Sequence, residues 1–165
     1  MPLIFIAALA LAPAPRASWS CETSASLSIA APASLCLSTF SDIERMPQWS
    51  PRLESVRLVA PGRSVWKLRL PRFLRLASVE WEAQHEVVPP SLVCWSSLSG
   101  VENEGSARFD PCDDGCVFEL SIAYNVGRLL QPLAKSSIVQ NWVQSTLVDT
   151  MERFRLVLED TATED

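Results

Sequence analysis

Residues 138–158, near the C-terminus, constrain the fold of this chain more than any other stretch. Their apolar residues recur at the spacing of one face of an α-helix, and polar residues occupy the other face. The apolar set consists of Ile138, Trp142, Val143, Leu147, Met151, Phe154 and Leu158. A helix with so wide an apolar stripe needs a large apolar surface to lie on. Since most of the preceding chain is predicted to form strands, we expect that surface to be a β-sheet.

Short segments that alternate between apolar and polar residues precede this helix. In the clearest of them, Trp81, Ala83 and His85 face one way and glutamates face the other. Short turns separate the segments, which favours an antiparallel meander over a parallel sheet. The predicted strands are residues 23–30, 53–59, 64–70, 76–88, 91–98, 104–110 and 116–125, with helices at 32–40 and 43–46 and a loop at 127–135.

The composition indicates one ordered domain. The 165 residues are 48% hydrophobic and 20% charged, which is enough for a sizeable core. A formal net charge of −5 argues against nucleic acid as a partner, because nucleic acids bind basic surfaces. No apolar run reaches the roughly 20 residues that a membrane-spanning helix needs, so we expect no transmembrane segment. The oligomeric state does not follow from these features.

An apolar run at residues 3–12 is followed by small residues and prolines. This pattern is typical of a targeting segment that is removed from the mature protein. We therefore expect residues 1–21 to be a leader (a signal or transit peptide), residues 22–160 to be the folded domain and residues 161–165 to be a disordered tail. The mature protein is then expected to be secreted or organellar, with the plastid as one destination.

Five short motifs follow one another along the chain. They are Met46-Pro47-Gln48-Trp49 with Leu53 and Val56, Trp95-x-Ser97-x-x-Gly100, Gly105-x-Ala107-x-Phe109, Ile122-x-Tyr124 and Met151-Glu152-x-Phe154. In this order, over residues 24–160, they resemble the polyketide cyclase/dehydrase and START-like superfamily, which includes ubiquinone-binding-type members. The resemblance implies an α+β helix-grip fold, in which a curved antiparallel sheet wraps around a long C-terminal helix. It also implies a hydrophobic cavity between sheet and helix.

Aromatic and aliphatic residues are predicted to line that cavity. The chain has six tryptophans, and aromatic walls suit flat or isoprenoid ligands. Ordinary core packing is the alternative use of the same side chains. The predicted ligand-binding residues are Trp66, Trp81, His85, Trp95, Phe109, Phe118, Leu120, Ile122, Tyr124 and Trp142.

His85 and Tyr124 are the candidate catalytic residues. His85 is the only histidine in the chain, and its alternation with Trp81 predicts an inward side chain. Such a histidine acts as a general base or as a polar handle for a ligand. The alternative is a core histidine satisfied by a hydrogen bond. A Ser-His-Asp triad would have to use this histidine, and no G-x-S-x-G motif is present.

The five cysteines leave at least one thiol unpaired within a monomer. Cys112 and Cys116 flank a predicted hairpin turn, so a disulfide across the hairpin and two free thiols are both compatible with the sequence. A C-x3-C pair without a second pair of ligands does not predict a zinc site. We expect neither a metal nor a cofactor.

Three hypotheses for function follow from these observations. The first is binding or transport of a hydrophobic small molecule, such as a lipid, a quinone or a polycyclic aromatic. The second is an enzyme of the cyclase/dehydratase type that uses His85 or Tyr124. The third is a protein-interaction module whose sheet groove takes a partner. The single histidine and the apolar inward faces of the strands favour the binder over the enzyme.

Overall fold

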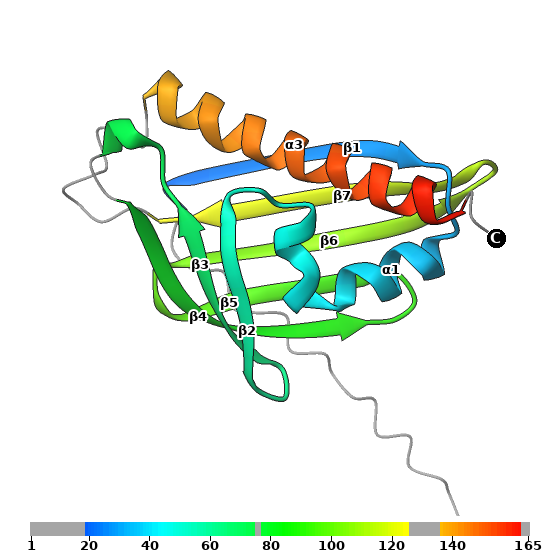
Figure 1. Ribbon diagram of the computed structural model, residues 1–165, viewed down its shortest axis with the longest axis horizontal. Coiled ribbons are helices and arrows are strands. Elements are labelled where there is room, and N and C mark those ends of the chain that lie inside the picture. The colour runs from blue at the N-terminus through cyan, green and yellow to red at the C-terminus, as the bar shows by residue number, and fades with distance from the viewer. Residues whose placement is uncertain (1–18, 75–76, 126–135, 163–165) are drawn as a thin grey trace, which may run out of the picture.

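Seven antiparallel strands form one sheet that curves around the C-terminal helix (Figure 1). The computed structural model describes residues 19–74, 77–125 and 136–162. The strands are β1 (Cys21–Ile29), β2 (Leu53–Ala60), β3 (Arg63–Arg69), β4 (Ser78–Val88), β5 (Leu92–Gly100), β6 (Asn103–Cys112) and β7 (Gly115–Tyr124). The helices are α1 (Ala33–Ser41), the 3₁₀ helices η1 (Ile43–Gln48) and η2 (Arg72–Leu74), and α3 (Ser137–Ala162).

The strand order is β1-β7-β6-β5-β4-β3-β2, so the first strand pairs with the last one. Strands β2 to β7 form a meander in which each strand pairs with the next. The connection from β1 to β2 carries α1 and η1, and α1 packs against β5, β6 and β7. This arrangement confirms the predicted α+β helix-grip fold.

Most predicted elements occur within a few residues of their expected bounds. Pro47 differs, because it lies inside η1 and does not end it. The amides of Trp49 and Ser50 both bond to the carbonyl of Met46, so the turn continues without a donor from the proline. The predicted loop at 127–135, and the residues 1–18 on which the leader prediction rests, lie outside the described residues.

One half of the space between sheet and helices is a solid aromatic core. The rings of Phe109 and Phe118 stack with centroids 4.7 Å apart. Phe40 of α1 lies 5.4 Å from Phe154 of α3 and 5.6 Å from each of the other two rings. All four side chains are almost fully buried. We call this end of the domain the closed end.

Helix α3 rests on the sheet along an apolar stripe that agrees with the predicted phase over most of its length. Leu147, Met151, Phe154 and Leu158 are buried. The prediction is wrong at the first turn, where Ile138 is 64% exposed and Val139 is buried instead. The apolar stripe of α3 is wider than the face of the helix that the sheet covers. Residues on one flank of the stripe, such as Ile138, are therefore exposed to solvent.

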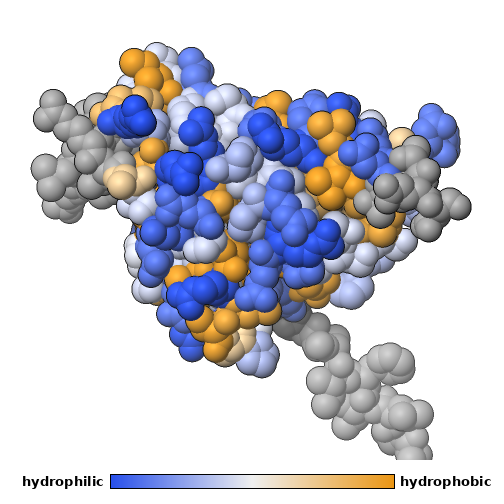
Figure 2. All heavy atoms as spheres, viewed as in Figure 1, coloured by the Kyte–Doolittle hydropathy of each residue, from blue (hydrophilic) through white to orange (hydrophobic). Residues whose placement is uncertain are grey.

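The outer surface is largely hydrophilic on the face shown in Figure 2, with smaller hydrophobic patches between the charged residues. Exposed large apolar side chains include Leu58 and Val59 on the edge strand β2 and Phe73 in η2. In the described part of the chain, no helix combines the length and apolar character needed to cross a membrane.

Candidate functional site

A cavity of about 900 Å³ lies between the concave face of the sheet, η1 and the N-terminal half of α3. Helix α3 packs on β1 and β7 at one side of the sheet, so the strands toward the other side enclose space beneath it. The chain therefore packs tightly at the closed end and leaves room at the opposite end. The aliphatic part of the lining consists of Leu53, Leu68, Leu70, Val79, Val101, Leu120, Ile122, Val139, Val143 and Leu147.

Three tryptophans from adjacent strands form one wall of the cavity. Trp66 of β3 stands directly opposite Trp81 of β4, and their rings are nearly parallel, with centroids 6.0 Å apart and planes 14° apart. Trp95 of β5 also stacks with Trp66, with a centroid distance of 6.4 Å and an angle of 23° between the planes. The three indoles therefore form one stacked aromatic cluster on this wall.

Several polar atoms on cavity-lining residues have no protein partner. Among the described residues, five buried side-chain nitrogen or oxygen atoms lack a hydrogen bond. Four of them belong to residues of this cavity: Nε1 of Trp49, Trp81 and Trp142, and Oδ1 of Asn103. Buried polar groups are normally paired, because leaving one unpaired costs about 1–3 kcal/mol. Three of these atoms are donors and one is an acceptor, and each atom is itself buried although another part of its residue lines the cavity.

Asn103 is held rigidly although its oxygen is unpaired. The residue is 3% exposed at the start of β6. Its Nδ2 donates to the carbonyl of Val101 at 2.9 Å, and its backbone amide donates to Oγ of Ser97 at 3.0 Å. These bonds fix the plane of the side-chain amide and identify which atom is the oxygen.

Tyr124, the only tyrosine of the chain, lines the cavity at the end of β7. Burial raises the pKa of its hydroxyl above the usual value, and the Cys21 thiol, opposite it on β1, adds to the effect. The hydroxyl therefore stays protonated at neutral pH and can both donate and accept a hydrogen bond. Beside it, Asn125 accepts from the backbone amide of Ser20 at 2.8 Å and donates to Glu102 at 2.8 Å, which joins this end of β7 to the chain before β1.

A family model described as polyketide cyclase/dehydrase and lipid transport matches residues 20–159. The chain belongs to this family. The match covers the whole sheet and nearly all of α3, and it agrees with the resemblance carried by the sequence motifs. No curated protein matches the chain in sequence.

Solved structures with the same fold include an aromatase/cyclase and a START superfamily protein. A protein of Thermus thermophilus has a TM-score of 0.74 at 20% identity, over 85% of this chain and 98% of that chain. A START superfamily protein from Mycobacterium smegmatis has a TM-score of 0.70 at 16% identity, over 85% and 98%. The Zhui aromatase/cyclase from a Streptomyces species has a TM-score of 0.68 at 16% identity, over 84% and 93%. At these identities the likeness shows a shared fold.

In this member of the polyketide cyclase/dehydrase family, the cavity gathers seven of the residues predicted to bind a ligand. They are Trp66, Trp81, Trp95, Leu120, Ile122, Tyr124 and Trp142. Phe109 and Phe118 do not line it, because they lie further along β6 and β7 and are fully buried in the aromatic core of the closed end. Their alternation was predicted correctly, but alternation does not say how far along a strand the cavity extends.

His85 is also absent from the cavity lining. It pairs with Trp95 across β4 and β5, but it lies four residues beyond Trp81, which is about 13 Å along a strand. Its Nδ1 is 3.4 Å from Oγ of Ser64, and the same oxygen accepts from Nε1 of Trp66 at 2.8 Å. Burial lowers the pKa of His85. These contacts fit the alternative interpretation of the sequence, in which His85 is a neutral histidine satisfied by a hydrogen bond.

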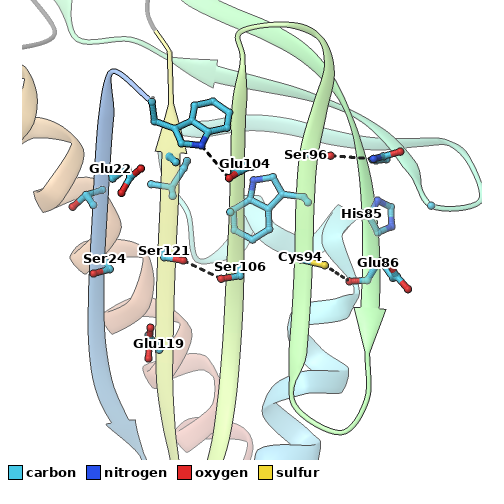
Figure 3. A pocket seen from close by; sticks show the side chains of 18 of the residues that line it. Glu22, Ser24, His85, Glu86, Cys94, Ser96, Glu104, Ser106, Glu119 and Ser121 are labelled. Atoms are coloured by element: carbon cyan, nitrogen blue, oxygen red, sulfur yellow. Dashed lines mark hydrogen bonds between the residues drawn. The ribbon is translucent and has the colours of Figure 1, made fainter. Parts of the chain in front are cut away.

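His85 also borders a second, more polar hollow, most of whose lining lies on the outer face of the sheet, although His85 itself shares the inward phase of its register partner Trp95. Figure 3 shows His85 at its edge, with Glu86, Cys94 and Ser96 nearby and the helices behind the sheet. Ser106 and Ser121 bond to each other across β6 and β7 at 2.9 Å. Most residues of this hollow belong to the outward-facing half of each strand. We assign it to the solvated face of the sheet.

Sequence reasoning missed several lining residues. Trp49, at the end of η1, belongs to one of the family motifs but was not predicted to bind a ligand, although it lines the cavity. Asn103 shares the inward phase of Gly105, Ala107 and Phe109, so alternation traced backward along β6 would have found it. The hydroxyls of Ser50 and Thr150 bond to each other at 3.1 Å and also line the cavity. A polar residue on the apolar side of a strand or helix is the signal that these positions share.

The sequence allowed either a disulfide between Cys112 and Cys116 or two free thiols, and the structure does not contain that disulfide. Cys112 pairs with Gly115 in the β6–β7 hairpin and is exposed, whereas Cys116 is fully buried. Since neighbouring positions along these strands point to opposite faces, the two thiols do not meet. All five cysteines lie in the described part of the chain, and none of them forms a disulfide. No cluster of three or more potential metal ligands occurs among the described residues.

Proposed function

We propose that this protein binds a planar, mainly apolar small molecule that carries oxygen atoms, such as a quinone or an oxygenated polycyclic aromatic, in the cavity between sheet and α3. The observation that carries the proposal is a cavity walled by three stacked tryptophans, several of whose lining residues also carry polar side-chain atoms without a protein partner. Three properties of the cavity support it, namely its size, its shape and its polarity.

The volume suits one small organic molecule. Ligand sites in proteins commonly enclose about 300–1,000 Å³ and are lined mainly by apolar side chains with a few polar groups. The cavity has about 900 Å³, an aliphatic lining and a small number of polar side chains. A ligand of drug size or of the size of a three-ring to four-ring aromatic fits within this space.

The shape favours a flat ligand. Trp66, Trp81 and Trp95 present nearly parallel rings, and Trp142 of α3 also lines the cavity. A planar ring system gains aromatic contacts with such a cluster beyond its buried area. A flexible acyl chain would lose conformational entropy in the same space without gaining those contacts.

The polarity favours oxygen atoms on the ligand. The indole N–H groups of Trp49, Trp81 and Trp142 are donors without partners, which suits carbonyl or ether oxygens. The unpaired Oδ1 of Asn103 suits a hydroxyl, and the neutral hydroxyl of Tyr124 suits either role. A pure hydrocarbon would leave all of these groups unpaired.

Tryptophan fluorescence with matched ligands tests this proposal. We expect anthraquinone and a hydroxylated anthraquinone to change the emission and to bind more tightly than anthracene or a fatty acid. Trp81→Phe keeps an aromatic ring and removes the N–H, and it should weaken quinone binding by about threefold to tenfold, the value of one hydrogen bond. Trp19→Phe is the matched control, because Trp19 donates to Glu104 in the outer hollow.

Two results would contradict the proposal. If none of the four compounds changed the emission or bound by calorimetry, the cavity would not be a ligand site for this class. The protein-interaction module would then be the remaining hypothesis. If the fatty acid bound most tightly, a lipid carrier would replace the aromatic binder.

A cyclase-type enzyme is the second candidate, and it is favoured by one observation. Tyr124 places a neutral hydroxyl, able to donate a proton, on the wall of the cavity. In an enzyme, Tyr124→Phe would abolish turnover of a polyketide substrate while leaving its affinity nearly unchanged. In a binder, the same variant would change only affinity. His85, the other candidate from the sequence, is not among the residues that line the cavity.

A further inference from the structure

Two buried thiols meet at the closed end of the domain. Sγ of Cys36, on α1, lies 3.3 Å from Sγ of Cys116, on β7. Both residues are 0% exposed, and both belong to the continuous hydrophobic core. They are 80 positions apart in the chain, so the fold alone brings them together. Neither residue lines the ligand cavity or the outer hollow.

We propose that Cys36 and Cys116 are an oxidative cross-linking site, at which a disulfide ties α1 to the sheet when the protein folds under oxidising conditions. A disulfide has an S–S distance of about 2.0 Å, so the sulfur atoms must approach by about 1.3 Å. Helix α1 is short, and its outer side, including Leu35, is exposed. The proposal requires this approach through an adjustment of the two side chains and of α1.

The chemistry needs an oxidant, and a low-molecular-weight disulfide such as oxidised glutathione is sufficient. The first cysteine thiolate attacks the glutathione disulfide and releases one glutathione thiolate. The second cysteine thiolate then attacks the mixed disulfide, forms the S–S bond of the protein and releases the second glutathione thiolate. The two protein thiols lose two protons and two electrons in total, and one glutathione disulfide becomes two glutathione thiols.

Burial decides when this reaction takes place. In the folded protein, burial raises the pKa of the Cys36 thiol far above its usual value and also raises the pKa of Cys116. Thiolate is the reactive form, so both groups are poor nucleophiles once they are buried. In the unfolded chain they have ordinary thiol reactivity. We therefore expect the bond to form while α1 docks on the sheet, and the same burial then protects it from reductants.

The cross-link is expected to stabilise the closed end and to leave the cavity unchanged. It closes a loop of about 80 residues, and a loop of this length loses much conformational entropy in the unfolded state. Because the bond lies among Phe40, Phe118 and their neighbours, it holds α1 without touching the tryptophan wall. The midpoint of thermal unfolding should rise by about 10 °C for a domain of this size.

Refolding the full chain in a buffer of oxidised and reduced glutathione tests the proposal. Digestion without reductant should yield a peptide pair joined through Cys36 and Cys116, with a mass about 2 Da below the sum of the two reduced peptides. The oxidised protein should melt about 10 °C higher than the same sample after reduction under denaturing conditions and refolding with reductant. Cys36→Ala and Cys116→Ala should lose this difference, whereas Cys94→Ala and Cys112→Ala should keep it.

Two results would overturn the proposal. One is that the refolded protein contains Cys36 and Cys116 as free thiols while the exposed Cys112 carries glutathione. The other is that the linked peptides join Cys112 or Cys94 to another cysteine. The peptide map of the wild-type chain decides between these results even if an alanine variant fails to fold. Ligand titrations are independent of this outcome, since neither cysteine lines the cavity.

Discussion

The ring of Trp95 lies directly against the backbone of Gly105 on the neighbouring strand. A Cβ atom at position 105 would be 2.1 Å from Cζ2 of Trp95, far inside van der Waals contact. The two residues are register partners across β5 and β6. The absent side chain at 105 therefore makes room for one of the three tryptophans that form the wall of the cavity.

Gly105→Ala is expected to displace the indole of Trp95 and to destabilise the protein by about 1–3 kcal/mol, as overpacking of a core does. Ligand affinity should fall as well, because the wall loses its stacked arrangement. Chemical denaturation and the fluorescence titration measure the two effects. Arg108→Ala, at an exposed position of the same strand, is the control and should stay within about 0.5 kcal/mol of wild type. An unchanged stability of Gly105→Ala would mean that the ring does not occupy this place.

Phe154→Ala and Trp142→Ala are expected to behave differently, although both lie on the apolar stripe of α3. Phe154 is fully buried among four aromatic rings, so its loss should cost about 3–5 kcal/mol. Trp142 is half-buried and lines the cavity, so its loss should cost less stability and more ligand affinity. Urea denaturation of both variants checks the order. A larger loss for Trp142→Ala would contradict the division into a closed end and a cavity end.

Asn103→Leu is expected to separate stability from binding. The substitution removes the unpaired Oδ1 from the cavity wall at the cost of the bond to Val101. Relief of the unpaired acceptor and loss of the bond to the Val101 carbonyl oppose each other, so the stability of the ligand-free protein should change by no more than about 1–2 kcal/mol. Binding of a hydroxylated anthraquinone should weaken, and binding of anthracene should not. A large loss of stability without any change in selectivity would mean that Asn103 has only a structural role.

Stability is expected to depend on pH through His85. Burial lowers the folded-state pKa of this histidine below the value of about 6.5 found in unfolded chains. Between the two values the unfolded state holds more protons, so stability rises with pH and is lost as pH falls through this window. His85→Gln should remove this part of the pH dependence and leave ligand affinity unchanged. The free energy of unfolding, measured by denaturation between about pH 5 and 8, tests this prediction. An identical pH profile in wild type and variant would contradict the assignment of this pH dependence to His85.

The N-terminal leader remains a prediction from the sequence. Trp19 donates to Glu104 and Ser20 bonds to Asn125, so a cut after residue 21 would remove contacts of the folded domain. We therefore expect cleavage before residue 19 in the native cell and a mature protein that is secreted or organellar. N-terminal sequencing of protein isolated from that cell measures this. Retention of Met1 would contradict both the leader and the proposed location.

Local patterns were enough to predict the fold. The two-residue alternation of the strands and the helical spacing after residue 137 depend only on neighbouring residues, so they can be read from the sequence. The same alternation assigned Trp66 and Trp81 to inward faces, but only the structure shows that they are register partners. The first turn of α3 was the exception, because the width of the apolar stripe does not show which flank the sheet leaves uncovered at Ile138.

The tertiary structure alone decided which apolar residues line the cavity and which fill the core. Phe118 and Leu120 share one face of β7 and have the same pattern in the sequence, yet only Leu120 reaches the cavity. The difference arises from where α1 and α3 lie along the strand, which is a long-range property. The meeting of Cys36 with Cys116 has the same origin. The sequence by itself determined the elements and their faces, while the position of each residue along the curved sheet depended on contacts between segments far apart in the chain.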